Sequence, residues 1–186
     1  MIEIKDLKKA FDKNVLFDGF SLSLPDKGFY ALSGPSGAGK TTLFRMISGL
    51  DTGYAGEINA DGKISYVFQE NRLLPQMTAY ENVFTVCGDK EKSLSLLREV
   101  GLIDAVDKYP SELSGGMNRR VAIARALSYG HDILLLDEPF TALDADIRDK
   151  IINLIKELEK DKLLLIITHD PDEISALGCE EIKIND

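Results

Sequence analysis

The sequence contains few cysteines, fewer basic than acidic residues, and no apolar run long enough to cross a bilayer. The two cysteines, Cys87 and Cys179, are far apart and show no metal-ligand spacing. They suggest no disulfide framework, so a reducing compartment is the simpler expectation. Lysine and arginine total 22 against 31 aspartate and glutamate residues. The net charge of −9 argues against a general attraction to nucleic acid or anionic lipid, so any anion site must be local.

The chain also lacks the segments that mark membrane insertion or export. Its longest apolar run, residues 163–167, has the length of a buried strand and not of a membrane span. The first five residues alternate like a strand and do not form the basic, apolar and small-residue series of a signal peptide. No internal repeat or Pro/Ser-rich linker separates a second unit. We therefore expect one domain over residues 1–186, without direct membrane insertion.

A glycine-rich segment matches a phosphate-binding P-loop at every fixed position. Backbone N–H groups in such a loop point into one concavity, and glycines let the backbone approach phosphate oxygens closely. Lys40 would place a positive charge against the outer phosphates, and the Thr41 hydroxyl would bind magnesium. The segment lies between an apolar strand at 29–32 and a helix N-terminus, which favours a nucleotide site over a plain turn. The motif residues are Gly34, Pro35, Ser36, Gly37, Ala38, Gly39, Lys40, Thr41 and Thr42.

The first half of the chain predicts a β-rich start followed by a helical segment. Period-two patterns at 2–4 and 20–24 predict strands of a sheet with one wet face, joined by a turn-rich stretch. Asp61-Gly62 predicts a hairpin between residues 57–60 and 63–68. A capping box at Thr78 starts a helical arm that extends over about 78–112.

The second half of the chain alternates strands and helices. Apolar runs at 133–136 and 163–167 predict strands buried on both faces, and residues 181–185 predict a terminal strand. Amphipathic or arginine-rich patterns at 117–127 and 147–158 predict helices, and a further helix begins after His169. The sequence thus predicts an α/β fold: a P-loop NTPase core with a mostly parallel sheet, an N-terminal antiparallel β subdomain and a helical arm.

Polar residues follow three further predicted strands at their carboxyl ends, where parallel sheets bind ligands. Asp137 would hold magnesium directly or through water, and Glu138 would orient or deprotonate the attacking water. His169 would contact the γ-phosphate or the glutamate, and Gln69 would sense metal and water. Taken singly, each residue also fits a structural role without catalysis, as a turn residue, a cap or a strand end.

Two other features leave alternatives open. Phe11 is an aromatic residue in the polar stretch 8–13 that either stacks on an adenine base or makes a satellite core contact, and its position alone slightly favours the core. Residues 113–117 form a second glycine-rich turn that feeds a helix N-terminus. This turn is either an ordinary helix start or a cap for a nucleotide held by another copy.

In this order, the motifs resemble those of the ATP-binding subunit of an ABC transporter, over essentially the whole chain. Residues 113–116, Leu-Ser-Gly-Gly, resemble the family signature, residues 142–144 its D-loop and residues 168–170 its switch-histidine segment. The resemblance is greatest to the nitrate/sulfonate/taurine importer type. It implies a head-to-tail dimer in which the signature turn of one subunit closes over ATP on the P-loop of the other. It also assigns nucleotide contacts outside the P-loop to Phe11, Ser114, Gly115, Gly116 and Asp144.

The function implied by the resemblance is an ATPase that dimerises around two MgATP and powers solute transport by a separate membrane permease. Its partners would be that permease, contacted between Gln69 and about Val83, and a second ATP-binding subunit, expected as a homodimer. It would lie in the cytoplasm, peripheral to the inner face of the cell membrane. The implied catalytic residues are Glu138, His169, Gln69 and Lys40, and the implied magnesium ligands are Thr41, Gln69 and Asp137.

Two other hypotheses compete with transport. One is a related ATPase in translation control or chromosome maintenance, but such proteins usually carry paired cassettes or coiled-coil insertions, and neither occurs here. The other is a binding module with an inactive site. The presence of every expected catalytic and metal-binding residue disfavours it.

Overall fold

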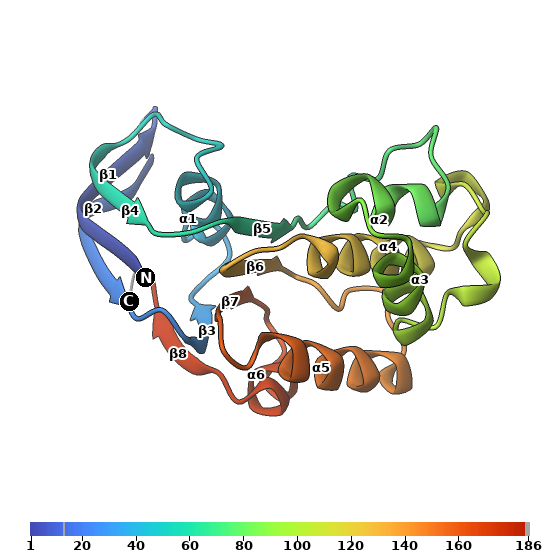
Figure 1. Cartoon of the computed structure of the whole chain (residues 1–186). Helices are drawn as coiled ribbons and strands as arrows, with labels where there is room; N and C mark the ends of the chain where they lie inside the picture. Colours follow the sequence, from blue (N-terminus) through green and yellow to red (C-terminus); the bar gives the residue numbers. More distant parts are fainter. Residues whose placement is uncertain (13, 185–186) are drawn as a thin grey trace.

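The computed structural model describes residues 1–12 and 14–184; Lys13, Asn185 and Asp186 lie outside the described residues. Its strands form a parallel sheet, in the order β5-β6-β7-β3-β8, and an antiparallel sheet, in the order β2-β1-β4. Figure 1 shows the antiparallel strands at one end of the molecule and α2, α3 and α4 at the other. The α/β fold class predicted from the sequence is confirmed. The strands are Ile2–Phe11 (β1), Asn14–Leu24 (β2), Gly28–Ser33 (β3), Ala55–Ala60 (β4), Ile64–Val67 (β5), Ile133–Asp137 (β6), Leu163–Ile167 (β7) and Glu180–Lys183 (β8).

The helices cover the parallel sheet and form the arm. α1 packs on the side of the antiparallel sheet, whereas α2 and α3 pack on α4 and on each other. The predicted arm begins with the predicted capping box, in which Thr78 Oγ1 accepts from the Glu81 N–H and Glu81 Oε2 accepts from the Thr78 N–H. Among the described residues, none of the helices is both long and apolar enough to cross a membrane. The helices are Lys40–Ile47 (α1), Ala79–Cys87 (α2), Lys90–Glu99 (α3), Gly115–Ser128 (α4), Ala145–Glu159 (α5) and Pro171–Leu177 (α6), with short 3₁₀ helices at Ile103–Ala105 and Pro110–Glu112.

The central strands β6 and β7 are buried on both faces and divide their side chains between two cores. Leu134 and Leu136 pack with residues of α4, α5 and the arm, whereas Ile133 and Leu135 pack with residues of α1 and the antiparallel sheet. β7 divides its residues in the same way. Continuous apolar runs of this kind are typical of parallel strands covered by helices, which is why both strands were predictable.

The hairpin predicted at Asp61-Gly62 is wrong. β4 pairs with β1 and β5 pairs with β6, so the turn joins the two sheets and not two paired strands. The Lys63 N–H donates to Asp132 Oδ2 at 2.7 Å, and the Lys63 carbonyl accepts from the N–H groups of Asp132 and Ile133. Gly62 has a φ of 109°, and a Cβ there would lie 2.6 Å from Asp132 Oδ2. The hydrogen bonds to the distant Asp132 therefore direct β5 to pair with β6 and not with β4, although the local sequence at Asp61-Gly62 favours a hairpin.

Three predicted boundaries also shift. The stretch expected to be turn-rich is mostly strand, because β1 and β2 pair along nearly their whole length with register shifts. The loop expected at 111–116 contains a 3₁₀ helix and the first residues of α4. The terminal strand predicted at 181–185 is found as β8, and Asn185 lies outside the described residues.

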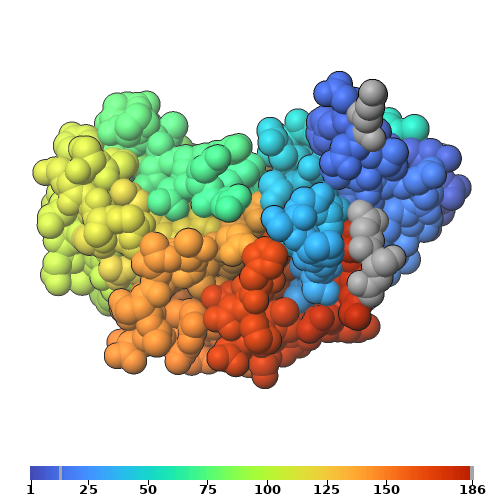
Figure 2. Space-filling view, turned by 180° about the vertical axis from the view of Figure 1, so that it is seen from behind, coloured from blue at the N-terminus to red at the C-terminus, as the bar shows by residue number. Residues whose placement is uncertain are grey.

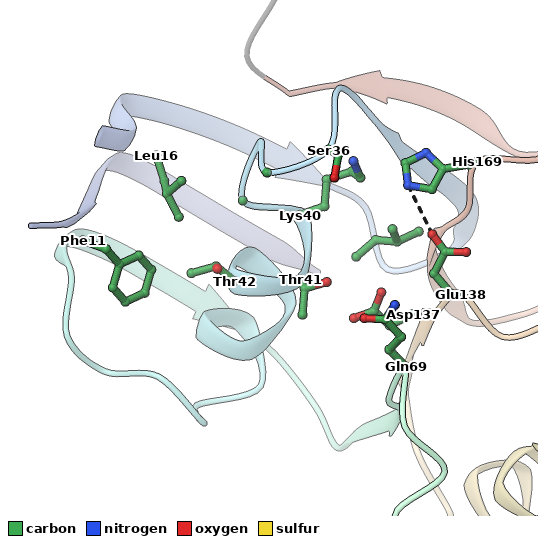
Figure 3. A pocket seen from close by; sticks show the side chains of 13 residues that line it. Phe11, Leu16, Ser36, Lys40, Thr41, Thr42, Gln69, Asp137, Glu138 and His169 are labelled. Atoms are coloured by element: carbon green, nitrogen blue, oxygen red, sulfur yellow. Dashed lines mark ion pairs between the residues drawn. The ribbon is translucent and has the colours of Figure 1, made fainter. Parts of the chain in front are cut away.

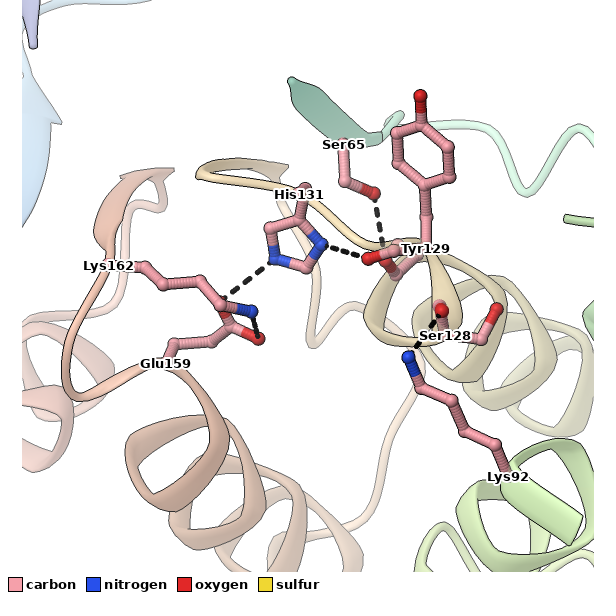
Figure 4. Close-up of polar contacts among 8 residues, drawn as sticks. Ser65, Lys92, Ser128, Tyr129, His131, Glu159 and Lys162 are labelled. Atoms are coloured by element: carbon pink, nitrogen blue, oxygen red, sulfur yellow. Dashed lines mark hydrogen bonds and ion pairs between the residues drawn. The ribbon is translucent and has the colours of Figure 1, made fainter. Parts of the chain in front are cut away.

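A buried polar cluster joins the segments that lead into β6 and β7 (Figure 4). His131 Nδ1 lies 2.6 Å from the Tyr129 carbonyl oxygen, and Nε2 lies 2.9 Å from Glu159 Oε2. Lys162 Nζ lies 3.1 Å from the same carboxylate oxygen. A backbone carbonyl and an ionised carboxylate can only accept, so each ring nitrogen of His131 faces an acceptor. Burial acts to raise the pKa of Glu159, but His131 and Lys162 outweigh it and hold this pKa below its ordinary value.

Candidate nucleotide-binding site

A cavity of about 320 Å³ lies beyond the carboxyl ends of β3, β5, β6 and β7. Figure 3 shows side chains from several segments, far apart in the sequence, that face this cavity. On the molecular surface, the light-blue P-loop lies beside the orange-red segment between β7 and α6 (Figure 2). The lining residues are Phe11, Leu16, Ser36, Gly37, Gly39, Lys40, Thr41, Thr42, Gln69, Asp137, Glu138, Ile167 and His169.

The N-terminus of α1 is built differently from the other α-helix starts. Among the α-helices of the described chain, α1 is the one whose N-cap, Gly39, offers no side-chain hydrogen bond. Its first turn also contains no acidic residue. The first N–H groups of a helix have no partner within the helix, and the helix dipole favours negative charge there. The start of α1 is therefore suited to an anionic ligand such as a phosphate.

The Lys40 ammonium folds back on the P-loop. Its Nζ donates to the carbonyl oxygens of Gly34 at 2.7 Å and Pro35 at 2.9 Å. An ammonium has three N–H donors, so two carbonyls leave one donor for another acceptor. The carbonyls also hold the charge at the cavity, which Lys40 lines.

Asp137 is the carboxylate best placed for a metal ion. Its pKa is raised, because burial outweighs the hydrogen bonds from Thr41 and Tyr66 and the charges of Arg119 and Lys40. The Tyr66 hydroxyl donates to Asp137 Oδ2 at 3.2 Å. The Thr41 hydroxyl and the Gln69 amide line the same cavity. Hydroxyl, carboxylate and amide oxygens are the hard donors that Mg²⁺ accepts, so these three residues fit a magnesium ion that also binds phosphate.

Glu138 and His169 form a pair at the opposite side of the cavity from Phe11 (Figure 3). His169 Nε2 lies 3.2 Å from Glu138 Oε1. Glu138 has a φ of 50°, a left-handed conformation that is uncommon for a side chain of its size. Such conformations are held in place by their surroundings and are enriched at functional sites.

Phe11 lies at the edge of the cavity and not in a core. Its side chain is 51% exposed, which contradicts the core contact slightly favoured from its sequence position. Lys9 Nζ lies 4.7 Å from the centroid of the Phe11 ring. The same ammonium is 2.8 Å from Asp51 Oδ2 and 2.7 Å from the Gly53 carbonyl oxygen. Lys9 thus joins the ring to the loop after α1.

The signature turn and Asp144 lie outside this cavity. Ser114 and Asp144 cap α4 and α5, with side-chain oxygens that accept from the N–H groups of Met117 and Ile147. A Cβ on Gly116 would lie 2.7 Å from the Ala142 carbonyl oxygen, so only glycine permits this close approach of the first turn of α4 to the loop before α5. Of the predicted nucleotide contacts, the structure thus places Ser114, Gly115, Gly116 and Asp144 away from the cavity within one chain, and Gly34, Pro35 and Ala38 in the P-loop but not on its lining.

Sequence reasoning missed three residues at the site. Leu16 and Ile167 line the cavity, and Tyr66 bonds to Asp137. Leu16 and Ile167 look like ordinary apolar strand residues, so nothing in the sequence marks them. Tyr66 lies on β5, three residues before Gln69. The parallel pairing of β5 with β6, a strand that ends at Asp137, is the signal that would have predicted a contact between Tyr66 and Asp137.

Comparison with known proteins identifies a family model and curated relatives. The family model described as ABC transporter matches residues 17–141. The chain is 43% identical to the aliphatic sulfonates import ATP-binding protein SsuB 3 of Paraburkholderia xenovorans, over 95% of this chain and 74% of that protein. It is 38% identical to the sulfate/thiosulfate import ATP-binding protein CysA of Escherichia coli, over 95% of this chain and 55% of that protein.

A solved structure gives the same result. The dimeric ATP-binding cassette MJ0796, in a post-hydrolysis state bound to ADP and Pi, superposes with a TM-score of 0.90 and 30% sequence identity. The match covers all of this chain and 94% of that one. Family model, curated relatives and solved structure thus point to the same family. The chain therefore belongs to the ABC transporter family, as one of its ATP-binding ATPase subunits.

Proposed function

We propose that this chain binds and hydrolyses ATP, as a single domain over residues 1–186, to power solute transport by a separate membrane permease. The observation that carries the proposal is the convergence of the P-loop, Gln69, Asp137, Glu138 and His169 on one cavity. Phosphoryl transfer depends on positioning and charge neutralisation, which these groups supply. The relatives named as import ATP-binding proteins support transport and do not favour translation control or chromosome maintenance.

The proposed chemistry assigns a separate task to each side chain. Glu138 accepts a proton from the attacking water, and its 3.2 Å contact with His169 fixes the direction of the carboxylate. His169 and Lys40 bind the terminal phosphate, and Gln69 orients the water. Thr41, Asp137 and Gln69 hold Mg²⁺, which neutralises phosphate charge when it is bound. Phe11 stacks on the adenine.

The proposed active unit contains two copies of the chain. Ser114, Gly115 and Gly116 begin α4 without an acidic residue in its first turn, so this helix start also favours an anion. It lies outside the cavity of its own chain, which supports a role over the nucleotide of a second ATP-binding subunit. Asp144 would face that subunit too, since Ala142, two residues before it, approaches Gly116 of the signature turn.

The permease is proposed to dock on the segment from Gln69 to about Val83, which places the chain at the inner face of the membrane. Just beyond this segment, Phe84 is partly exposed and stacks on Tyr80 with ring centroids 5.4 Å apart. Arg72 covers the Phe68 ring with its guanidinium 4.0 Å from the centroid. The exposed Phe84 ring at the end of this segment supports a protein partner at this position.

The proposal is tested with purified wild-type chain and Glu138→Gln. The wild type is expected to hydrolyse ATP with Mg²⁺, and the variant to bind ATP and form an ATP-dependent dimer with turnover reduced about a hundredfold or more. Phosphate release measures turnover, and gel filtration with and without ATP measures dimerisation. Normal turnover by the variant would show that Glu138 is not the base. A wild type without activity, alone or with a co-purified permease, would refute the ATPase.

A further inference from the structure

Arg119 lies on α4 and is almost completely buried, with 2% of its surface exposed. Its guanidinium reaches two loops that lie far from it in sequence. Nη2 donates to the carbonyl oxygens of Asp137 and Glu138, both at 2.7 Å, and Nε donates to that of Pro139 at 2.8 Å. Nη1 donates to the carbonyl oxygen of Phe68, and to that of Gln69 at 3.3 Å. One side chain thus holds the segments that carry Glu138 and Gln69.

These carbonyls lie at and beyond the last pair that joins β5 to β6. The pairing of β5 with β6 ends at Val67 and Leu136. β6 continues for one more residue, Asp137, which pairs only with β7, and a loop follows each strand. The planar fork of an arginine can serve both loops at once, because its five N–H groups have fixed directions. Arg119 therefore continues the connection between the two strands beyond the last pair of the ladder.

The charge of Arg119 is held mainly by backbone dipoles. Its bonds go to five carbonyl oxygens, with a longer contact of 3.5 Å to Asn71 Oδ1, and no ion pair of Arg119 occurs among the described residues. Burial lowers the pKa of Arg119 to about 10, which leaves it charged at neutral pH. A buried charge requires such bonds, so the loops cannot separate from Arg119 without a large penalty.

Glu138 is the residue in this contact with a left-handed backbone conformation. Its positive φ turns the chain abruptly after β6, and the carbonyls held by Arg119 belong to Glu138 itself and to the residues on either side of it. Movement of this peptide would move the carboxylate. The bonds from Arg119 oppose that movement.

We propose that Arg119 is a positioning residue that fixes Glu138 relative to Gln69 for hydrolysis. This inference rests on the proposed function, because it takes Glu138 as the base. Among the described residues, Arg119 forms no hydrogen bond to the P-loop or to a side chain that lines the cavity, so its loss is expected to affect turnover more than ATP binding.

The test compares Arg119→Lys and Arg119→Gln with the wild type and with Arg120→Lys. A lysine keeps the charge but has a single donor atom, which cannot span both loops. Arg120 is the matched control, since it is the next residue on α4 and also donates to carbonyls, those of Val100 and Gly101, which are far from the site. Turnover is measured by phosphate release, ATP affinity by equilibrium titration, and folding by thermal unfolding.

We expect kcat to fall about tenfold or more in Arg119→Lys, because small displacements of a catalytic group have large effects on rate. Its affinity for ATP is expected to stay within about threefold, and Arg120→Lys to match the wild type in both measurements. Arg119→Lys guards against the case in which Arg119→Gln does not fold.

Each other outcome overturns the inference. Wild-type kcat in Arg119→Lys would show that the guanidinium does not position Glu138. Equal losses of kcat in Arg119→Lys and Arg120→Lys, or a parallel loss of ATP affinity, would show a general role in stability. Glu138→Gln separates failure of the inference from failure of the proposed function. If Glu138→Gln is inactive while Arg119→Lys has normal turnover, only the inference about Arg119 fails. If Glu138→Gln is active, Glu138 is not the base, and the inference about Arg119 fails as well.

Discussion

Replacement of His131 by leucine is expected to destabilise the protein strongly. His131 and Glu159 are 0% and 1% exposed, and their contact of 2.9 Å is the shortest ion-pair contact of the Glu159 carboxylate. Removing one partner of a buried ion pair typically costs about 3–5 kcal/mol, because the other charge remains buried. Lys162 Nζ, 3.1 Å from the same oxygen and one-third exposed, still compensates part of the charge. We therefore expect the lower end of that range, about 3 kcal/mol.

Urea unfolding at neutral pH measures this change. With a slope of about 2 kcal/mol per molar, typical of small proteins, the midpoint should fall by about 1.5 M. Lys162→Met is the matched control, and it is expected to cost less than about 1 kcal/mol because Lys162 is partly solvated. The double replacement His131→Leu with Glu159→Leu should recover most of the loss, since no unpaired charge is left in the interior.

Acid unfolding supplies a second measurement on the same pair. The pKa of Glu159 in the folded chain is held below its ordinary value. Its contribution to stability is therefore complete above that ordinary value and is lost as the pH falls through the folded pKa. In His131→Leu this acid-side loss should shrink. A midpoint unchanged to within about 0.3 M, or a double variant no better than His131→Leu, would refute the buried ion pair.

Two further predictions concern the nucleotide site. Lys9→Met should weaken ATP binding about threefold to tenfold and leave tripolyphosphate binding unchanged, because it removes the cation beside Phe11 but not the P-loop. Lys8→Met, which loses only an exposed pair with Asp18, is the control in equilibrium titrations, and an equal loss for both ligands would contradict the prediction. Tyr66→Phe should raise the magnesium concentration needed for half-maximal ATPase activity about threefold to tenfold, because Asp137 loses an orienting hydrogen bond. An unchanged magnesium dependence would show that Asp137 is held without Tyr66.

The parts of the fold that were predictable are those encoded by neighbouring residues. The P-loop has its glycines, lysine and threonine within nine positions, and the strand before it and the helix after it confirm the context. The strand at 133–136 is apolar throughout because helices cover both of its faces. The capping box at Thr78 likewise fixes a helix start by contacts that span three residues.

The errors and omissions have non-local causes. Asp61-Gly62 has a strong hairpin pattern, but the partner that decides the path of β5 is Asp132, which is 69 positions from Lys63. Phe11 could not be assigned to core or cavity from the residues next to it in sequence. The position of its ring depends on Lys9, which is bound to the loop after α1. Arg119 looked like one of three helical arginines, because the carbonyls that it binds belong to loops 18 to 51 positions away. The assignment of individual site residues stays a prediction until the variants are measured.

The position of β3 between β7 and β8 limits when the nucleotide site can form during synthesis. β3 carries the P-loop at its end, yet both of its hydrogen-bonded neighbours lie within residues 163–183. A nascent chain that has emerged only as far as α5 contains the whole P-loop sequence but no strand to hold it. The ribosome must therefore release the chain through β8 before both neighbours of β3 are present and ATP can act as a folding ligand, and until β7 emerges β3 is an unpaired apolar strand that chaperones would recognise.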